Sequence, residues 1–532
     1  MKKLLIILLC LVLVGCTVAE PQPTAPPSQK PTESTVPTEP VAPPPKDQTV
    51  KTDYSQYTPR QTLQPLYLPM ETACEDLQPS EDYGAIYPYV GTTLASAYGG
   101  SHYVYGIMDE KGQLLTAPVY RNVQRLEYWD DYLGEERVIL PFWTLTKTEV
   151  LDQGEYPVYH NRQALASLDG SWVTECRYTG ISVSDDRILA MEKDWESDSF
   201  RFDFYDTEGR LLLTSEELEI LSRIPNSISY AGYSDGMIRL DCYNYTKIDG
   251  NVWYTTGDGS TWYIDPEGSV LLGPYASGDN FSDGLAMVSD DYDSYYYIDK
   301  AGNPQFDRSF NGGESFKNGV ALVNTGSRYQ VIDTKGKVLL DTMGYSSIYR
   351  DREYFVVTTD YINTYYDLQG QVVFEDIPFN WSYLGHGLFS DWAEEIIHGE
   401  TQRRFTVSRE PEAYHYAQSL WEQGVEALLV TDYSGDSTTS YLLDENAELI
   451  MEFEGEAFVL EDGQRSLLII NDGGSFKIYN GELEYLFSCP REAEPSMVCG
   501  DRLICFSEQY SLCYSLEGEL VFCYPLPGFG GD

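Results

Sequence analysis

Acidic side chains are the chemistry-bearing groups that this sequence offers in greatest number. Asp and Glu total 84 against 35 Lys and Arg, which gives a formal net charge of −49. A surface this negative repels phosphate backbones, so the composition excludes nucleic acid as a partner. Paired carboxylates are the groups that a glycan hydrolase uses as acid and base. In a chain so rich in acids, however, such pairs arise by composition alone and do not predict catalysis.

Other catalytic constellations are missing from the sequence. The five His residues, at positions 102, 160, 386, 398 and 415, show no zinc-binding spacing. There is no Gly-x-Ser-x-Gly elbow and no phosphate-binding loop. Residues 256–262 approach the Asp-box turn of sialidase propellers, but they are one residue short and occur once, which favours a structural turn. We therefore expect no enzymatic activity, no catalytic residue, no metal ligand and no cofactor.

One acidic cluster suggests a metal alternative, because oxygen ligands suit Ca²⁺. Five aspartates crowd a short region, namely Asp279, Asp283, Asp290, Asp291 and Asp293. The spacing of an EF-hand loop is absent, and turns on a solvated surface explain the same residues. We expect turn residues here and keep calcium as the alternative.

The ten cysteines fall into two groups. Cys10 and Cys16 lie at the N-terminus, and the others are Cys74, Cys176, Cys242, Cys489, Cys499, Cys505, Cys513 and Cys523. In an exported protein the second group could form disulfides. Buried thiols that act as small hydrophobic side chains are the equal alternative, and the connectivity of any disulfides is not readable from spacing.

The N-terminus has the organisation of an export signal. Lys2 and Lys3 precede an unbroken apolar run from Leu4 to Val14, which is too short to span a bilayer. The run ends in Leu13-Val14-Gly15-Cys16, which resembles the lipobox of bacterial lipoprotein precursors. The resemblance implies that residues 1–15 are a cleaved signal peptide and that Cys16 is lipidated. We expect a chain anchored to the cell membrane and facing the extracytoplasmic side.

Residues 16–62 form the next segment, and their composition is typical of a stalk. Proline recurs throughout, mixed with Thr, Ser, Glu and Gln. Such a segment buries no apolar surface and is expected to be disordered and extended. It would hold the rest of the chain away from the membrane.

Beyond the stalk, a repeated turn organises the sequence. An aromatic-rich run leads into Asp-x-x-Gly, and a second apolar run follows. Asp can accept a backbone N–H ahead of it and Gly supplies a positive φ, so each copy predicts a β-hairpin. Four Asp residues of the series stand 34 residues apart. The structural turn residues are Asp109 and Gly112, Asp206 and Gly209, Asp265 and Gly268, Asp299 and Gly302, Asp333 and Gly336, and Asp367 and Gly370.

A second element precedes several of these hairpins and adds a strand. Its pattern is aromatic-x-x-Gly followed by alternating apolar residues, as from Phe281 to Val288 and from Phe316 to Val323. Each unit then reads as a three-stranded meander that cannot bury its apolar face alone. Units of this kind must stack on one another.

The two elements together resemble the WG-repeat family of bacterial surface and secreted proteins, although Tyr-Gly, Trp-Tyr and Tyr-Tyr stand in place of Trp-Gly. The resemblance is good over 257–375 and weak beyond 375. We expect an all-β, repeat-built β-propeller, with an open β-solenoid of β-meanders as the alternative. The repeat domain would cover 63–375, with an insertion or boundary at 376–420, where Asp391 to Gly399 predicts a short helix, and degenerate repeats at 421–532.

The resemblance implies binding or scaffolding and supplies no catalytic residue. We therefore predict a cell-envelope lipoprotein that displays a β-repeat domain to an unknown envelope protein or glycan. Exposed Tyr and Trp side chains could stack on sugars or grip peptides, although most at the hairpins are expected to be core. The alternative function is an envelope glycan hydrolase with carboxylates carried on loops.

Overall fold

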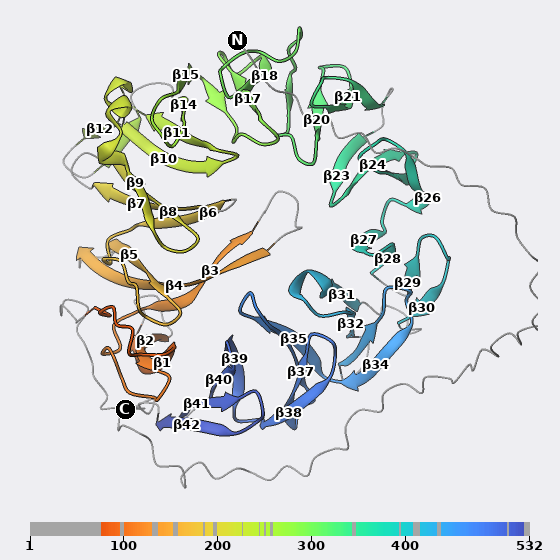
Figure 1. The fold of residues 1–532 in the computed structure, drawn as a ribbon. Helices are drawn as coiled ribbons and strands as arrows, with labels where there is room; N and C mark the ends of the chain where they lie inside the picture. Colours follow the sequence, from red (N-terminus) through yellow and green to blue (C-terminus); the bar gives the residue numbers. More distant parts are fainter. Residues whose placement is uncertain are drawn as a thin grey trace, which may run out of the picture. The chain divides into compact units, whose positions relative to one another are not determined.

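The computed structural model shows an all-β chain in which successive sheets follow one another as the blades of a β-propeller (Figure 1). It describes residues 76–525, all within the unit 42–532. The gaps are 96–100, 130–136, 153–157, 185–186, 195–198, 226, 244, 249–251, 256–258, 343–346, 393–394, 408–414, 434–437 and 508–509. The predicted signal peptide, Cys16, the predicted stalk, Cys74 and residues 256–258 of the Asp-box-like stretch lie outside the described residues.

Ten sheets of three or four antiparallel strands form the ten blades of the described region. The first five blades consist of β3 (Asn122–Trp129), β4 (Arg137–Asp152) and β5 (Val158–Ser167); β6 (Gly180–Ser184), β7 (Arg187–Asp194), β8 (Ser199–Asp206) and β9 (Leu211–Thr214); β10 (Ser227–Ser234), β11 (Met237–Tyr243), β14 (Ser260–Ile264) and β15 (Leu271–Tyr275); β16 (Ser277–Gly278), β17 (Leu285–Ser289) and β18 (Tyr295–Asp299); and β19 (Gly312–Gly313), β20 (Val320–Asn324), β21 (Tyr329–Asp333) and β22 (Val338–Asp341).

The other five blades continue in the same antiparallel order along the chain. They consist of β23 (Ser347–Asp351), β24 (Tyr354–Thr359), β25 (Ile362–Tyr366) and β26 (Val372–Pro378); β27 (Ser382–Gly385), β28 (Leu388–Ser390), β29 (Glu395–His398) and β30 (Arg404–Thr406); β31 (His415–Ser419), β32 (Leu428–Asp432), β33 (Thr439–Leu443) and β34 (Leu449–Glu454); β35 (Glu456–Glu461), β36 (Ser466–Asn471), β37 (Ser475–Asn480) and β38 (Tyr485–Pro490); and β39 (Glu494–Cys499), β40 (Arg502–Phe506), β41 (Tyr510–Ser515) and β42 (Leu520–Pro525).

Two further sheets have two strands each. The hairpin of β12 (Tyr245–Ile248) and β13 (Val252–Thr255) is inserted between β11 and β14, and the pair of β1 (Ile86–Ala95) and β2 (Ser101–Asp109) starts the described chain. One apolar cluster joins Ile86 and Met108 of this first pair to Trp143 of β4 and to Ile504 and Phe522 of the last blade. The first and last sheets therefore pack together, which protects strand edges that an open array would expose.

Helical structure in the described chain is limited to short 3₁₀ turns. These are η2 (Ser215–Glu217), η3 (Glu219–Arg223) and η4 (Trp421–Gln423). No helix in this part of the protein has the length and apolar character needed to cross a membrane.

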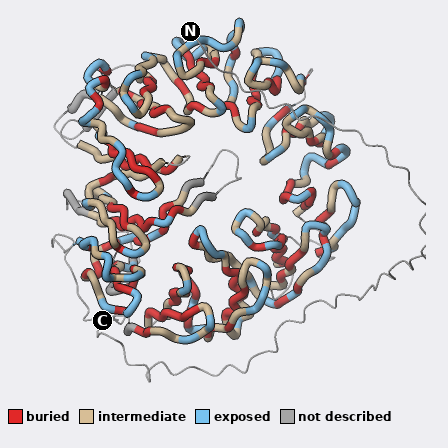
Figure 2. The backbone as a smooth tube through the Cα atoms, viewed as in Figure 1, coloured by how far each residue is buried: buried red, intermediate tan, exposed pale blue. Residues whose placement is uncertain are grey.

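Most blades have four strands, whereas the sequence predicted three for each unit. In the four-stranded blades the additional strand is the first one, which in β19 is only two residues long; β16, the first strand of a three-stranded blade, is equally short. Two residues produce no hydrophobic alternation, so the strand has no sequence signal. Short first strands also explain how a 34-residue repeat fits a four-stranded blade. Figure 2 shows buried residues along the strands of the blades and exposed ones mainly at their turns.

The repeated turns have the geometry that their sequence suggests. Oδ1 of Asp333 accepts the N–H groups of Lys335 and Lys337, both at 2.9 Å, and Gly336 has φ 77°. Asp109, Asp206, Asp299 and Asp367 accept the N–H groups two and four residues ahead at 2.7–3.1 Å. Asp265 instead accepts those of Ser269 and Val270, at 2.7 and 2.8 Å. The glycines Gly112, Gly209, Gly268, Gly302, Gly336 and Gly370 have φ between 66° and 82°.

The turn glycines have a second role that the sequence did not indicate. A Cβ on Gly336 would lie 2.8 Å from the ring of Phe306 in the preceding blade, and one on Gly370 would lie 2.7 Å from the carbonyl oxygen of Leu339 in β22. The absence of a side chain therefore lets neighbouring blades approach closely. In two later blades Ala447 (φ 59°) and Leu483 (φ 65°) hold the equivalent position.

Residues 376–420 depart most clearly from expectation. The segment contains the end of β26, the whole blade β27–β30 and all of β31, the first strand of the next blade. The helix predicted from Asp391 to Gly399 is wrong, because Glu395–His398 is the strand β29. Asp391 Oδ1 does accept the N–H of Glu395, at 3.0 Å, but it closes a turn, and the β-branched pair Ile396 and Ile397 continues as a buried strand.

Candidate functional site

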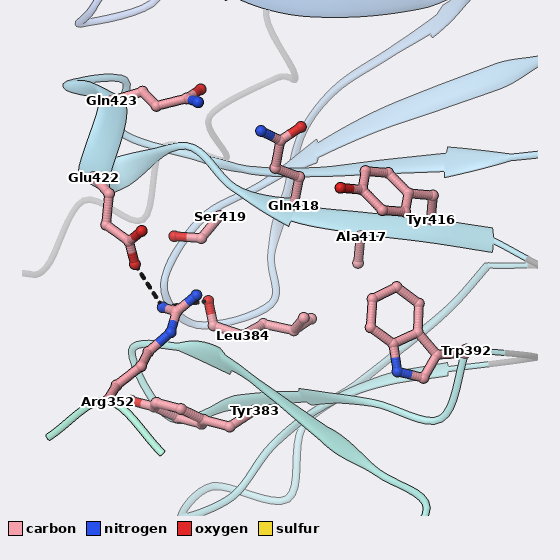
Figure 3. A pocket seen from close by; sticks show the side chains of 10 residues that line it. All are labelled: Arg352, Tyr383, Leu384, Trp392, Tyr416, Ala417, Gln418, Ser419, Glu422 and Gln423. Atoms are coloured by element: carbon pink, nitrogen blue, oxygen red, sulfur yellow. Dashed lines mark hydrogen bonds and ion pairs between the residues drawn. The ribbon is translucent and has the colours of Figure 1, made fainter. Parts of the chain in front are cut away.

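A pocket of about 330 Å³ lies where the blade β27–β30 meets the blade β31–β34 (Figure 3). The strand β31 and the adjoining η4 provide most of its wall, and the preceding two blades complete it. Its ten lining residues are Arg352, Tyr383, Leu384, Trp392, Tyr416, Ala417, Gln418, Ser419, Glu422 and Gln423. The Arg352–Glu422 ion pair stands at one end and the aromatic rings of Trp392 and Tyr416 at the other. The volume suits a small polar ligand or one residue of a polymer.

Trp392 is held in place by its own polar groups. Its indole N–H donates to Ser382 Oγ at 2.7 Å, and its backbone N–H donates to Ser390 Oγ at 2.9 Å. The backbone has φ 62°, a conformation that bulky residues seldom adopt and that the surrounding structure must enforce. The ring centroid of Tyr416 lies 6.1 Å away. Trp392 therefore presents a fixed ring face to the pocket rather than its N–H.

A buried Ser–His pair lies beneath Trp392. Ser390 Oγ and His415 Nε2 are 2.7 Å apart, and the two residues are 0% and 2% exposed. A nucleophile and base need this kind of distance, but they must also reach a substrate. Burial removes that access, while Ser390 hydrogen-bonds the Trp392 backbone and His415 stacks on its ring at 6.4 Å. The pair therefore positions Trp392.

The charged end of the pocket is internally compensated. Arg352 Nη1 lies 2.8 Å from Glu422 Oε1, donates to the carbonyl oxygen of Leu384 at 3.3 Å, and lies over the ring of Tyr383. Burial and the negative charge of Glu353 raise the pKa of Glu422, and Arg352 offsets part of this shift. Burial, together with the hydrogen bond to Glu353 at 2.8 Å, raises the pKa of Tyr383 and keeps its hydroxyl protonated.

The residues predicted as repeat turns lie away from this pocket. None of the twelve Asp and Gly residues is among those that line it. They close the turns described above and pack one blade against the next, so their place is structural.

The aspartates of the calcium alternative are dispersed among different contacts. Asp283 Oδ2 accepts the N–H of Gly319 in the next blade at 2.7 Å, and Asp290 accepts the hydroxyl of Tyr296 at 3.0 Å. Asp291 Oδ1 accepts two backbone N–H groups within its own turn. Among the described residues, no three His, Cys, Asp or Glu side chains are grouped so that they could hold a metal ion.

The cysteines of the domain are mostly buried small side chains. Cys176, Cys242, Cys489, Cys499, Cys505 and Cys523 take part in no disulfide, and only Cys176 is partly exposed. Burial raises the pKa of Cys176 to about 11 and that of Cys242 to about 12. The thiols of Cys176 and Cys242 are therefore protonated near neutral pH.

The fold and the pocket place the chain in the class of β-propeller repeat proteins. No protein-family model and no curated protein matches its sequence. Solved structures that share weak similarity with it include the following three. Kluyvelomyces marxianus Hsv2 is 10% identical, with 46% of this chain and 96% of that chain covered and a TM-score of 0.23. Dihydro-heme d1 dehydrogenase NirN in complex with DHE is 11% identical (70% and 78% covered, TM-score 0.27), and the tricorn protease is 10% identical (81% and 62% covered, TM-score 0.21). These similarities assign no function to the chain.

Proposed function

We propose that this protein is a cell-envelope lipoprotein whose β-propeller binds an extracytoplasmic protein or glycan without catalysis. The observation that carries the proposal is the pocket, in which a fixed tryptophan and a half-exposed tyrosine stand beside polar side chains. Pockets that combine aromatic faces with a few placed polar groups are typical binding sites. The lipobox-like Leu13-Val14-Gly15-Cys16 and the proline-rich stalk support display at a membrane surface.

Binding is preferred to hydrolysis on the chemistry of the pocket wall. Glycoside hydrolysis uses two carboxylates that face the same bond. Among the ten residues that line the pocket, Glu422 is the one carboxylate, and it is ion-paired with Arg352. A single compensated carboxylate fits the recognition of hydroxyl groups better than acid–base catalysis.

The anchor is tested by lipid labelling of the full-length protein in a bacterial host. Wild-type protein and the control Cys10→Ser, altered within the signal peptide, should incorporate labelled palmitate and sediment with membranes. Cys16→Ser should do neither, because it lacks the thiol that carries the diacylglycerol. Several acyl chains are needed for firm anchoring, so loss of lipid should release the protein. Equal labelling of Cys16→Ser would refute the proposed anchor.

The binding role is tested on the same full-length protein in detergent. Affinity capture against envelope extracts and against a glycan array should return a partner that is lost on thermal unfolding. Turnover of a glycan substrate, with no stable partner, would replace the proposal by the hydrolase alternative.

A further inference from the structure

The pocket offers two aromatic faces whose polar edges are mostly occupied. The Trp392 indole N–H is committed to Ser382, so a ligand meets the ring through its apolar face. Tyr416 is 50% exposed and stands beside that face. The faces of sugar rings carry C–H groups and pack flat on such side chains, burying apolar surface on both partners.

Polar side chains line the rest of the pocket. Gln418 and Ser419 follow Tyr416 on β31, and Gln423 comes from η4 (Figure 3). The Oε1 atom of Gln423 is buried and accepts no hydrogen bond from the described residues. A buried acceptor left without a donor costs free energy, so a ligand that supplies a hydroxyl or N–H group recovers that cost.

The charges of the pocket select against anions. The one cation, Arg352, is already paired with Glu422 and hydrogen-bonded to Leu384, and Glu353 adds negative charge behind Tyr383. The chain as a whole has a net charge of −49. An anionic ligand would have to displace Glu422 from Arg352 and approach a strongly negative surface.

We infer that this pocket binds a neutral saccharide, with a sugar ring stacked on Trp392 and Tyr416 and its hydroxyl groups bound by Gln418, Ser419 and Gln423. The inference rests on the proposed function, because it names the ligand class of the same site. Ser390 and His415 act as positioning residues that hold Trp392 in its left-handed backbone conformation.

The experiment is titration calorimetry of the full-length protein in detergent with defined oligosaccharides. The neutral probes are maltohexaose, cellohexaose, mannohexaose and chitohexaose, and the anionic probes are oligogalacturonate and hyaluronan fragments. At least one neutral probe should bind, and the anionic probes should bind at least tenfold more weakly. Tyr416→Ala should weaken the binding of that neutral probe about tenfold, as removal of a stacking aromatic does.

Matched variants separate stacking from folding. Tyr485→Ala removes a tyrosine of similar exposure on the outer strand β38 and should leave binding unchanged. Trp392→Phe keeps a ring face and should retain part of the affinity, whereas Trp392→Ala should lose it. Thermal melts of each variant show whether the domain is intact.

The outcomes distinguish this inference from the proposed function. If no neutral probe binds but an envelope protein is captured, the saccharide inference is overturned and the binding function stands. Equal binding of anionic probes, or an unchanged affinity in Tyr416→Ala, also overturns it. If no partner of any kind is found, both fail.

Discussion

Replacing turn glycines by alanine separates two energetic costs: that of a positive φ in a non-glycine residue and that of a steric clash between neighbouring blades. Gly370 and Gly473 have nearly the same backbone conformation, with φ 79° and 78°. A Cβ on Gly370 would lie 2.7 Å from the carbonyl oxygen of Leu339 in the preceding blade, whereas a Cβ on Gly473 would meet nothing within 4 Å. The two substitutions therefore differ in the contact between blades and share the cost of a positive φ.

The magnitudes follow from these two contributions. A left-handed backbone costs a non-glycine residue about 1–2 kcal/mol, and the lower entropy of alanine in the unfolded chain returns about 0.4–1 kcal/mol. Gly473→Ala should thus lower the free energy of unfolding by about 0.5–1 kcal/mol. Overpacking against a backbone atom adds about 1–3 kcal/mol, so Gly370→Ala should lower the free energy of unfolding by about 1.5–4 kcal/mol.

Hydrogen exchange read by mass spectrometry is the suitable assay, because repeat arrays can open locally before they unfold globally. In Gly370→Ala, faster exchange should be centred on β22 and on β25, the strands on either side of the new contact. In Gly473→Ala it should stay small and close to the β36–β37 turn. Equal losses in the two variants would refute the claim that the motif glycine is required for contact between blades.

Three further predictions concern separate features. Asp283→Ala should speed hydrogen exchange of the Gly319 amide about fivefold, because it removes a hydrogen bond between blades worth about 1 kcal/mol. Asp283→Asn keeps an acceptor and should restore slow exchange. No change in either variant would show that the bond contributes nothing. Asp279→Asn should raise the melting temperature at pH 7 and lose this advantage near pH 3.5. Burial raises the pKa of Asp279, an effect that Arg239 opposes and Asp241 reinforces. Ionisation of Asp279 therefore destabilises the fold as the pH rises above 3.8, the pKa of the group in the unfolded chain. A gain in melting temperature that does not depend on pH would contradict this. At least six thiols should react with a chromogenic disulfide reagent in denaturant without prior reduction, and fewer would indicate disulfides.

The sequence predicted those parts of the fold that depend on local hydrogen bonds. Asp299 and Asp333 close their turns with contacts no more than four residues away, so a short motif is enough to identify the hairpin. The first strand of a blade is held by its neighbour in the sheet. In β16 and β19 it has two residues, so the motif contained no information about it.

The pocket could not be predicted in the same way, because packing between blades assembles it. Its residues come from the β23–β24 turn, from β27, from the segment that follows β28 and from β31 with η4. No repeat motif includes Trp392, and its positive φ has no sequence signature outside Gly, Asn and Asp. The available signal is negative: residues 376–420 break the repeat pattern, which predicts only an insertion or boundary.

That break has a physical interpretation. Where the motif holds, a glycine lets the turn approach the preceding blade until backbone and side chains touch, and little space is left between blades. In the blades β31–β34 and β35–β38 the equivalent positions carry Ala447 and Leu483, whose side chains pack in the apolar clusters between blades. Such side chains require more separation than glycine does. The pocket lies at the start of this region. Beyond residue 375 the sequence departs from the repeat motif, and it is here that the propeller has room for a ligand.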